Sequence, residues 1–282
     1  MKGFNNLGNT CYLNSGLQML VQNLDLCNII RAFKDKSPIL GQLADFINEY
    51  HNDSNNSISP KLIKKIASNR NSIFMGYQQQ DSSEFIVFLL DFINNEINKV
   101  CNTKNLVDKI FEIEITTATK CKVLSCLTIS KNIEKSTMLM LNVNSECSTL
   151  DDCYNFSKQR VKLEGDEKYY CEKCEKKRIA SQRKEITKWP KNLIVWLRRY
   201  QHIGRRLSKY TQPIQVPVQW RNNYKLKGVV FHSGSLYGGH YVYAGLQDGK
   251  WYLFNDSSVS ELEHSALVNI VNNGYIYYYD RS

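Results

Sequence analysis

The first hundred residues carry apolar side chains at three- and four-residue steps, which is the spacing of amphipathic helices. One face of the stretch after residue 10 holds Leu13, Leu17, Leu20, Val21 and Leu24. The segments 41–47 and 81–97 show the same pattern, and the second opens with Asp81-Ser82-Ser83-Glu84, which has the spacing of a capping box. Ser59-Pro60 predicts another helix, with Ser59 as N-cap and Pro60 as first helical residue. We therefore expect residues 1–100 to be mostly helical.

From about residue 101 the pattern changes to short strand-like runs. Partial alternation marks 110–115 and 138–143, and 193–197 is a continuous apolar run, as expected of a strand buried on both faces. Further runs lie at 224–233, 241–246, 251–255 and 275–279. Helices first and strands after favour an α+β fold in which a helical layer packs on a sheet. We expect one domain over 1–282.

Composition and charge limit the functional classes. The chain has 282 residues, a formal net charge of +10 and a sequence pI of about 9.0. Its densest basic group, Lys173 with 176–178, alternates with acids, so we expect a solvated basic surface and no nucleic-acid partner. No run reaches the roughly 18 apolar residues of a membrane span. We expect no membrane association.

Cysteine usage and the first residues of the chain suggest the compartment. The nine cysteines are an odd number at irregular spacing, which favours free thiols or metal ligands over a disulfide framework. The chain opens without a basic segment followed by an apolar one, so no secretory leader is expected. These features predict a cytoplasmic or nuclear protein that is not secreted.

A cysteine lies where a polar turn meets the first helical pattern. The turn is Gly8-Asn9-Thr10, and Cys11 follows it directly. At a helix N-terminus, unpaired backbone N–H groups and the positive end of the helix dipole favour a thiolate over a thiol. A nucleophilic thiolate needs a base and a group that orients the base. Cys11 is therefore the candidate nucleophile.

The candidate base lies far along the chain. His240 follows Gly238-Gly239, which lets a substrate backbone come close or a loop move. His240 opens one predicted strand, and the next predicted strand ends in Asn255-Asp256. Neighbouring strands would bring Asn255 or Asp256 to the ring nitrogen of His240 that does not face Cys11, as in a cysteine-protease triad. Taken alone, however, an isolated histidine is more often structural.

Two cysteine pairs have the spacing of a structural zinc site. Cys171 and Cys174 form a C-x2-C knuckle, and Cys121 and Cys126 form a C-x4-C pair upstream. Structural zinc sites combine cysteines at such spacings into a tetrahedral set of four thiolates. The two pairs lie at opposite ends of a strand-rich segment, so a Zn²⁺ ion would hold its tip together. Buried thiols without metal are the alternative.

Five motifs, in order, give the chain a resemblance to the ubiquitin-specific protease family of papain-like cysteine deubiquitinases. Residues 6–15 resemble the family's cysteine box, and 76–85 its glutamine-rich box. Residues 168–174 resemble the family's zinc knuckle, although its first cysteine pair is usually C-x2-C, and residues 189–190 with 197–200 resemble its central strand. Its histidine box resembles His232-Ser233-Gly234 with 238–255. The match spans about residues 3–280.

The resemblance implies a hand-like fold. A helical thumb would span residues 1–100, a β fingers insert with zinc at its tip 101–190, and a β palm 191–282. It also implies that loops around 202–209 and 234–239 gate the substrate tail. Loops that contain glycines suit such movement.

The resemblance assigns a role to each residue of the active site. Cys11 is the nucleophile and His240 the base. Asn255 occupies the position of the third triad member, and Asp256 is the adjacent candidate. Asn6, five residues before the cysteine, matches the residue whose side-chain amide helps to bind the oxyanion, together with the Cys11 backbone N–H.

The resemblance also predicts how a substrate is read. The ubiquitin tail carries arginines and ends in Gly-Gly. Asp81 and Glu84 match acidic positions that would meet those arginines, although a capping role is a competing explanation for Glu84. Gly238, Gly239 and Tyr241 would wall a slot too narrow for any Cβ.

The implied function is thiol-dependent hydrolysis of the bond after the C-terminal glycine of ubiquitin, through an acyl-enzyme thioester. The implied partners are ubiquitin and ubiquitinated proteins, and we expect a monomer. Two alternatives stay open at this point. One is a catalytically silent ubiquitin-binding scaffold, and the other is a protease for a ubiquitin-like modifier that shares the Gly-Gly tail.

Overall fold

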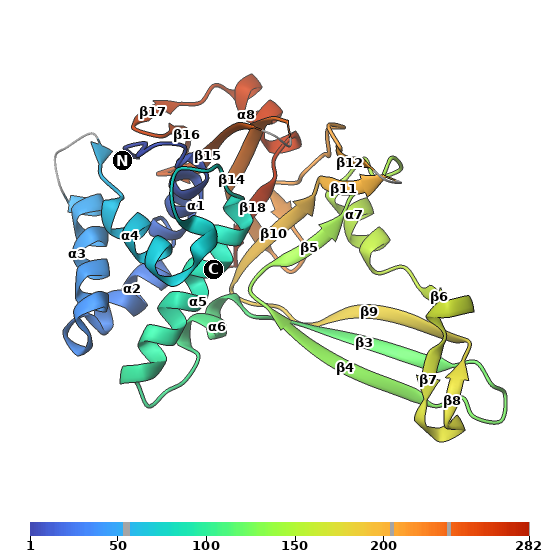
Figure 1. Cartoon of the computed structure of the whole chain (residues 1–282). Helices are drawn as coiled ribbons and strands as arrows, with labels where there is room; N and C mark the ends of the chain where they lie inside the picture. Colours follow the sequence, from blue (N-terminus) through green and yellow to red (C-terminus); the bar gives the residue numbers. More distant parts are fainter. Residues whose placement is uncertain (53–56, 204–205, 236–237, 282) are drawn as a thin grey trace.

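The computed structural model describes residues 1–52, 57–203, 206–235 and 238–281, except for the side chains of residues 201–207. Figure 1 shows a group of helices on one side of a central sheet and a long β arm that extends away from both. The N-terminal helices and the C-terminal strands, although far apart in sequence, lie side by side in this arrangement.

The helical layer comes from the N-terminal part of the chain. Its described α-helices are α1 (Cys11–Val21), α2 (Leu24–Ala32), α3 (Pro38–Asn52), α4 (Lys61–Arg70), α5 (Ser82–Val100) and α6 (Leu106–Phe111), with 3₁₀ turns η1 (Lys34–Lys36) and η2 (Ser72–Phe74). The short strands β1 (Gly3–Phe4) and β2 (Ser57–Ile58) pair in parallel beside them. Helix α1 is buried along its whole length, so protein surrounds the helix on every side and not only on the expected apolar face.

The central sheet is formed mainly by the C-terminal part of the chain. Its strands lie in the order β17 (Ser258–Glu261), β16 (Lys250–Asn255), β15 (Gly239–Gln247), β14 (Tyr224–Gly234), β18 (Ile276–Asp280), β10 (Asn192–Arg198) and β5 (Leu139–Asn142), and β13 (Gln219–Trp220) pairs with β14. Among these described strands only β5 and β10 pair in parallel, and the other neighbours are antiparallel. The strands predicted at 193–197, 224–233 and 275–279 are confirmed with nearly the same bounds.

Both faces of the central sheet are buried, which explains the continuous apolar run of β10. Ile194 belongs to the core that the sheet shares with the helical layer, whereas Leu193 and Val195 belong to a second core on the opposite face. Helices α7 (Leu150–Ser157) and α8 (His264–Asn272) contribute to this second core. The α+β class is confirmed, since the sheet is covered by helices from separate parts of the chain.

The β arm is a second, four-stranded sheet in the order β4 (Ile129–Ser136), β3 (Ile113–Cys121), β9 (Ala180–Lys188) and β6 (Val161–Leu163). At its end, β7 (Tyr169–Cys171) and β8 (Lys176–Arg178) form a small hairpin that includes the turn η4 (Glu172–Cys174), and η3 (Gly165–Glu167) precedes it. A further hairpin, β11 (Tyr200–Ile203) with β12 (Arg206–Lys209), lies beside the central sheet.

Three local expectations differ from the structure. Helix α4 begins at Lys61 with Pro60 at its N-cap, and the Ser59 hydroxyl is buried without a hydrogen-bond partner among the described residues, so Ser59 is not the cap. Residues 110–111 end α6 instead of opening a strand. Asp81 does cap α5, but it does so by accepting from the Ser83 backbone N–H, with no reciprocal bond from Glu84 in the described chain.

The division into thumb, fingers and palm at residues 100 and 190 stays a prediction. The strand pairings run across it, because β5 belongs to the central sheet by its pairing with β10. Three parts defined by their packing therefore describe the molecule: the helical layer, the central sheet and the β arm.

Candidate active site

Cys11 is the first residue of α1, as the sequence predicts. The turn before it contains Gly8 (φ +98°) and Asn9 (φ +52°), both in the left-handed region that favours glycine and asparagine. A side chain at Gly8 would also meet the ring of Tyr77, since a Cβ there would lie 2.9 Å from it. The turn is closed by the Thr10 hydroxyl, which accepts from the Leu7 N–H at 2.8 Å.

The surroundings of Cys11 oppose a free thiolate. The side chain is buried, and burial raises the pKa of the thiol, as does the negative charge of Asp256. Backbone N–H groups, the first of them from Tyr241, act in the opposite direction and lower the pKa. The net shift is upward, so the helix N-terminus alone does not produce a thiolate. The thiol needs a base to remove its proton.

His240 is held by Asn255. Its Nε2 and the Asn255 side-chain oxygen lie 2.6 Å apart, so Nε2–H donates to this oxygen and Nδ1 is left unprotonated in the neutral ring. Asn255 is the last residue of β16, the strand that neighbours β15. The backbone N–H of Tyr241, the residue after His240, lies near enough to the Cys11 sulfur to lower the pKa of the thiol. The structure thus brings the Cys11, His240 and Asn255 segments together.

Asp256 faces a different way from Asn255. It adopts φ +50°, and its two carboxylate oxygens accept from the side-chain amides of Asn6 at 2.8 Å and Asn14 at 2.7 Å. Its backbone oxygen also accepts from the Phe4 N–H. Of the two alternatives left open by the sequence, Asn255 is the one that bonds His240, and Asp256 ties the N-terminal segment to the central sheet.

Asn6 is fixed on both sides of its side-chain amide. Its Oδ1 accepts from the backbone N–H groups of Gly8 at 2.9 Å and Thr10 at 3.2 Å, while Nδ2 donates to Asp256. An amide NH₂ has two donors, so a second N–H of Asn6 remains beside the Cys11 turn. The bonds to the turn and to Asp256 set the direction of that donor.

Asp81 has two partners within the protein. Its Oδ1 accepts from the Ser83 N–H and hydroxyl, each at 2.6 Å, and its Oδ2 accepts from the Tyr275 hydroxyl at 2.6 Å. Asp81 therefore joins the start of α5 to the central sheet. Glu84, in the first turn of α5, is exposed, and no hydrogen bond or ion pair within the described residues involves its carboxylate. Partial burial and the nearby Asp81 charge raise the pKa of Glu84.

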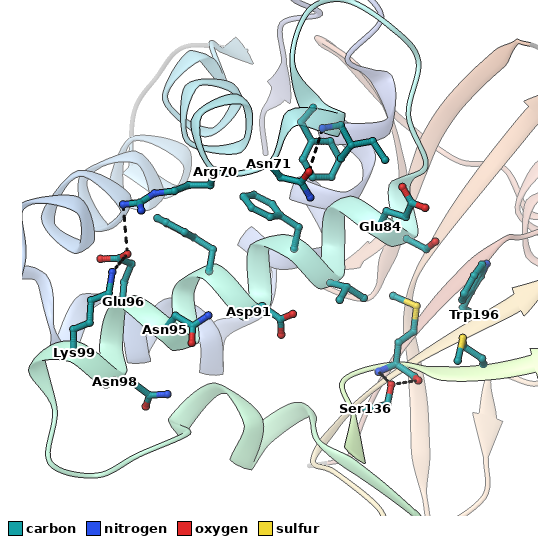
Figure 2. A pocket seen from close by; sticks show the side chains of 18 residues that line it. Arg70, Asn71, Glu84, Asp91, Asn95, Glu96, Asn98, Lys99, Ser136 and Trp196 are labelled. Carbon is teal, nitrogen blue, oxygen red and sulfur yellow. Dashed lines mark hydrogen bonds and ion pairs between the residues drawn. The ribbon is translucent and has the colours of Figure 1, made fainter. Parts of the chain in front are cut away.

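A cavity of about 1230 Å³ lies between α5, the end of α4 and the strands β4, β5 and β10. Figure 2 shows Glu84 and Asp91 on α5, with Trp196 and Ser136 on the strands that face this helix. Asp91 is exposed. Glu96 at the far end of the cavity is paired with Lys99 at 2.6 Å and Arg70 at 3.8 Å. Within the described residues, Glu84 and Asp91 have no such cation, so this wall of the cavity is acidic.

Gly238, Gly239 and Tyr241, which were expected to line a narrow slot for a Gly-Gly tail, have different surroundings. A Cβ on Gly239 would lie 2.3 Å from Nε2 of His232, so packing against His232 already requires glycine there. A Cβ on Gly238 would meet only Gln79 among the described residues, at 3.8 Å. The Tyr241 ring is buried and packs against the His232 ring, with centroids 4.3 Å apart, while the Tyr241 backbone N–H lowers the pKa of the Cys11 thiol.

His232 is a buried histidine that nothing in the sequence singles out beyond its place in the histidine-box resemblance. Its Nδ1 lies 2.6 Å from the Tyr200 hydroxyl, and Lys209 donates to its backbone oxygen and to that of Gly234, each at 3.0 Å. Burial, followed by the charges of Lys209 and His240, lowers the pKa of His232 to about 4. His232 is therefore neutral at pH 7 and supports the strand before the His240 loop.

Gln79 is a residue to which the sequence assigned no role, although it lies in the glutamine-rich segment 76–85. Its side-chain amide donates to the Gly239 backbone oxygen and accepts from the Gly239 N–H, both at 3.0 Å. The signal that could have found it is the run Gln78-Gln79-Gln80, because three amides in a row contribute little to a core.

The predicted cysteine cluster is present at the tip of the β arm. The sulfur atoms of Cys121, Cys126, Cys171 and Cys174 all lie within 4.8 Å of one another, and those of Cys126 and Cys171 are 3.6 Å apart. Four thiolates around a tetrahedral Zn²⁺, with Zn–S near 2.3 Å, would be separated by about 3.8 Å. The donor set and its spacing fit a metal ion of this kind.

Parts of two predicted gating loops lie outside the described residues. Residues 204–205 and 236–237, and the side chains of 202–207, fall within the loops expected at 202–209 and 234–239. Among the helices that are described, none combines the length and the apolar character that crossing a membrane requires.

Comparison with protein families finds one match that covers nearly the whole chain. A family model described as ubiquitin carboxyl-terminal hydrolase matches residues 2–279. The ubiquitin carboxyl-terminal hydrolase 2 of Bos taurus is 28% identical over 335 aligned residues, which cover 99% of this chain and 55% of the relative. The ubiquitin carboxyl-terminal hydrolase Usp2 of Drosophila melanogaster is 25% identical, with coverage of 99% and 35%. This chain thus spans about half, or less, of these relatives.

Solved structures share the fold. One, described as the SAGA Ubp8/Sgf11/Sus1/Sgf73 DUB module bound to ubiquitin aldehyde, has a TM-score of 0.85 at 22% identity and covers 100% of this chain and 70% of its own. A second, described as a SAGA DUB module bound to monoubiquitin, has a TM-score of 0.81 at 24% identity, with coverage of 100% and 69%. At these identities the similarity establishes the fold alone.

Proposed function

Since the chain belongs to the ubiquitin carboxyl-terminal hydrolase family, we propose that it is a thiol-dependent deubiquitinase that hydrolyses (iso)peptide bonds at the C-terminal glycine of ubiquitin. The observation that carries this proposal is the arrangement around His240, whose Nε2 is bonded to Asn255 while β15, the strand that contains His240, packs against α1, the helix that begins at Cys11. A nucleophile, a base and a group that orients the base are the parts that nucleophilic catalysis by cysteine requires.

The reaction begins with proton transfer from the Cys11 thiol to His240. Because Asn255 occupies Nε2, the proton goes to Nδ1. The thiolate attacks the carbonyl carbon of the terminal glycine and forms a tetrahedral intermediate. Its collapse breaks the bond to the leaving amine, which takes the proton from His240, and leaves a thioester on Cys11. Water, deprotonated by His240, then hydrolyses the thioester and restores the thiol.

Asn6 is proposed to stabilise the negative oxygen of that intermediate. Its second Nδ2–H and the Cys11 backbone N–H are the two donors of the oxyanion hole. The bonds that Asn6 accepts from Gly8 and Thr10, and the one that it donates to Asp256, hold its side chain before substrate arrives. Preorganised donors of this kind contribute strongly because they need no rearrangement in the transition state.

The acidic wall of the cavity supports recognition of an arginine-bearing tail. Glu84 is the carboxylate proposed to meet tail arginines, because it is exposed and has no cation of its own within the described chain. Asp81 contributes its charge, although its oxygens already bond Ser83 and Tyr275. Gly238 and Gly239, which directly precede His240, are proposed to admit a Gly-Gly end.

Zn²⁺ is proposed at the tip of the β arm, held by Cys121, Cys126, Cys171 and Cys174. The ion would be structural, since four protein ligands leave no open position for substrate. It would link η4 and β7 to the turn between β3 and β4. A monomer, a cytoplasmic or nuclear location and the absence of a nucleic-acid partner remain predictions from sequence.

Turnover of ubiquitin with a fluorogenic group at its C-terminus tests the proposed function. We expect steady-state hydrolysis by the wild type and none by Cys11→Ala. No turnover by folded wild type, or turnover that Cys11→Ala leaves unchanged, would exclude it. A parallel panel of ubiquitin-like tails separates ubiquitin from other modifiers, and tight ubiquitin binding without turnover would point to the silent scaffold.

A further inference from the structure

The carboxamide of Gln79 imitates a neighbouring strand for one residue of β15. It donates to the backbone oxygen of Gly239 and accepts from its N–H, each at 3.0 Å. This two-point pattern is the one that residues of adjacent antiparallel strands exchange. Gln79 belongs to the segment that precedes α5, so the two bonds join the helical layer to the central sheet.

Gly239 needs this partner because the edge of β15 is incomplete at that position. On one side β15 pairs with β14, down to the pair Gly234–Gly239. On the other side its pairing with β16 begins only at Tyr243 and Phe254. Within the described residues, Gly239 therefore has a strand on one edge and Gln79 on the other, immediately before His240.

We propose that Gln79 is a positioning residue, which fixes Gly239 and thereby holds His240 in reach of Cys11. The inference rests on the proposed function and extends it to a residue that does not touch the reacting atoms. The backbone beside Gln79 is held in place, because Asp81, two residues later, caps α5 and accepts from the Tyr275 hydroxyl. His232, packed closely behind Gly239, blocks movement in the other direction.

The expected signature separates positioning from stability. Gln79 is exposed, so water can replace its hydrogen bonds and folding should change little when they are lost. The geometry of the base is more sensitive, since a displacement of about 1 Å from a productive arrangement can cost on the order of 10²-fold in rate. Loss of Gln79 should therefore lower kcat and leave KM for ubiquitin substrates nearly unchanged.

The test compares Gln79→Met with Gln78→Met. Methionine keeps the length of the side chain without its hydrogen-bonding groups, and Gln78 is an exposed neighbour for which no hydrogen bond occurs within the described residues. Three quantities are measured for each protein: kcat and KM on the fluorogenic ubiquitin substrate, the rate of Cys11 alkylation by iodoacetamide near pH 7, and the thermal midpoint. His240→Ala is the reference for a missing base.

We expect Gln79→Met to lower kcat by about 10- to 100-fold and to slow Cys11 alkylation toward the His240→Ala rate, with Gln78→Met within about twofold of wild type. Should Gln79→Met not fold, the same comparison uses Gln79→Glu, which keeps the length and cannot donate to the Gly239 oxygen at neutral pH. The alkylation measurement needs no ubiquitin, so it decides the role of Gln79 even if the proposed substrate is wrong.

Three results would overturn the inference. If kcat and alkylation stay close to wild type, Gly239 needs no partner. If only KM rises, Gln79 contacts ubiquitin instead of positioning the base. If kcat or the alkylation rate increases in Gln79→Met, the hydrogen bonds between the Gln79 carboxamide and the Gly239 backbone oppose catalysis.

Discussion

At the scale of single residues, Cys11 shows how two local effects compete. The helix N-terminus and the backbone N–H groups around the sulfur favour the thiolate, but burial and the Asp256 charge disfavour it more. The sequence reveals the first effect, because the turn and the helical pattern are local. It does not reveal the second, because Asp256 lies near the other end of the chain and burial depends on the whole core.

Replacement of Asn6 by alanine tests the oxyanion role. Loss of one oxyanion donor costs about 10²–10³-fold in kcat, and KM should change little because the ground-state carbonyl is less dependent on the donor. Steady-state kinetics on the fluorogenic substrate measures both. Asn5→Ala is the matched control, since the exposed Asn5 side chain lies one residue away. Equal kcat values for the two variants would contradict the assignment.

The low pKa of His232 predicts how stability depends on pH. The ordinary histidine pKa is about 6.5, and in the folded protein it falls to about 4. Between pH 6.5 and pH 4, His232 is protonated in the unfolded chain but stays neutral in the folded protein. His232 therefore contributes nothing at pH 7 and destabilises the fold progressively as the pH falls to 4, by on the order of 1–3 kcal/mol.

Urea unfolding at pH 7 and pH 5 measures this effect. Relative to wild type, His232→Gln should lose less stability between the two pH values, whatever its stability at pH 7. His264→Gln, which changes an exposed histidine on α8, should behave like wild type. An identical loss in wild type and His232→Gln would mean that His232 takes up its proton in the folded state.

At the scale of elements, long periodic segments were predictable and short ones were not. The stripe of α5 and the apolar run of β10 each contain enough positions to define a period and a buried face. Helix α6 is short, and the alternation at 110–115 concealed its end, because residues 110–111 belong to α6 and 113–115 to β3. The Ser59 hydroxyl failed as a cap because Pro60 itself occupies the cap position and the helix begins one residue later.

The tip of the β arm is the element that should depend on metal. Its hairpin β7–β8 has only three residues in each strand, too few to be stable alone. Purified wild type should contain about one zinc ion per chain, and Cys174→Ser should lose it and expose the tip to proteolysis. Cys101→Ser, which lies outside the cluster, should keep the metal. Wild type without zinc would refute the site, as would full retention of zinc by Cys174→Ser.

At the scale of the whole molecule, the proposed active site is formed by segments that are distant in the sequence. The sequence indicated Cys11, His240 and the pair Asn255-Asp256, because each lies beside a recognisable turn or strand end. It could not decide between Asn255 and Asp256, since adjacent residues of a strand end differ only in the direction they face. Gln79 escaped prediction for a related reason: its partner is a backbone group 160 residues away.

The cavity between the helical layer and the two sheets carries a prediction about substrate binding. Glu84→Gln removes from the cavity wall a carboxylate that has no ion-pair partner among the described residues. KM for ubiquitin substrates should therefore rise about three- to tenfold, while kcat stays nearly constant. Asp45→Asn, an exposed change on α3 outside the cavity, is the control. A change in kcat alone, or an equal effect of Asp45→Asn, would show that Glu84 does not bind the tail.

The central claim is that Cys11, His240 and Asn255 form one nucleophilic unit, and covalent labelling tests it most directly. The protein is incubated with ubiquitin that bears an electrophile in place of its terminal glycine, and the adduct is located by mass spectrometry. We predict a single adduct on Cys11 in wild type, none in Cys11→Ala and a much slower reaction in His240→Ala. Folded wild type that stays unlabelled, or that is labelled on another cysteine, would contradict the account.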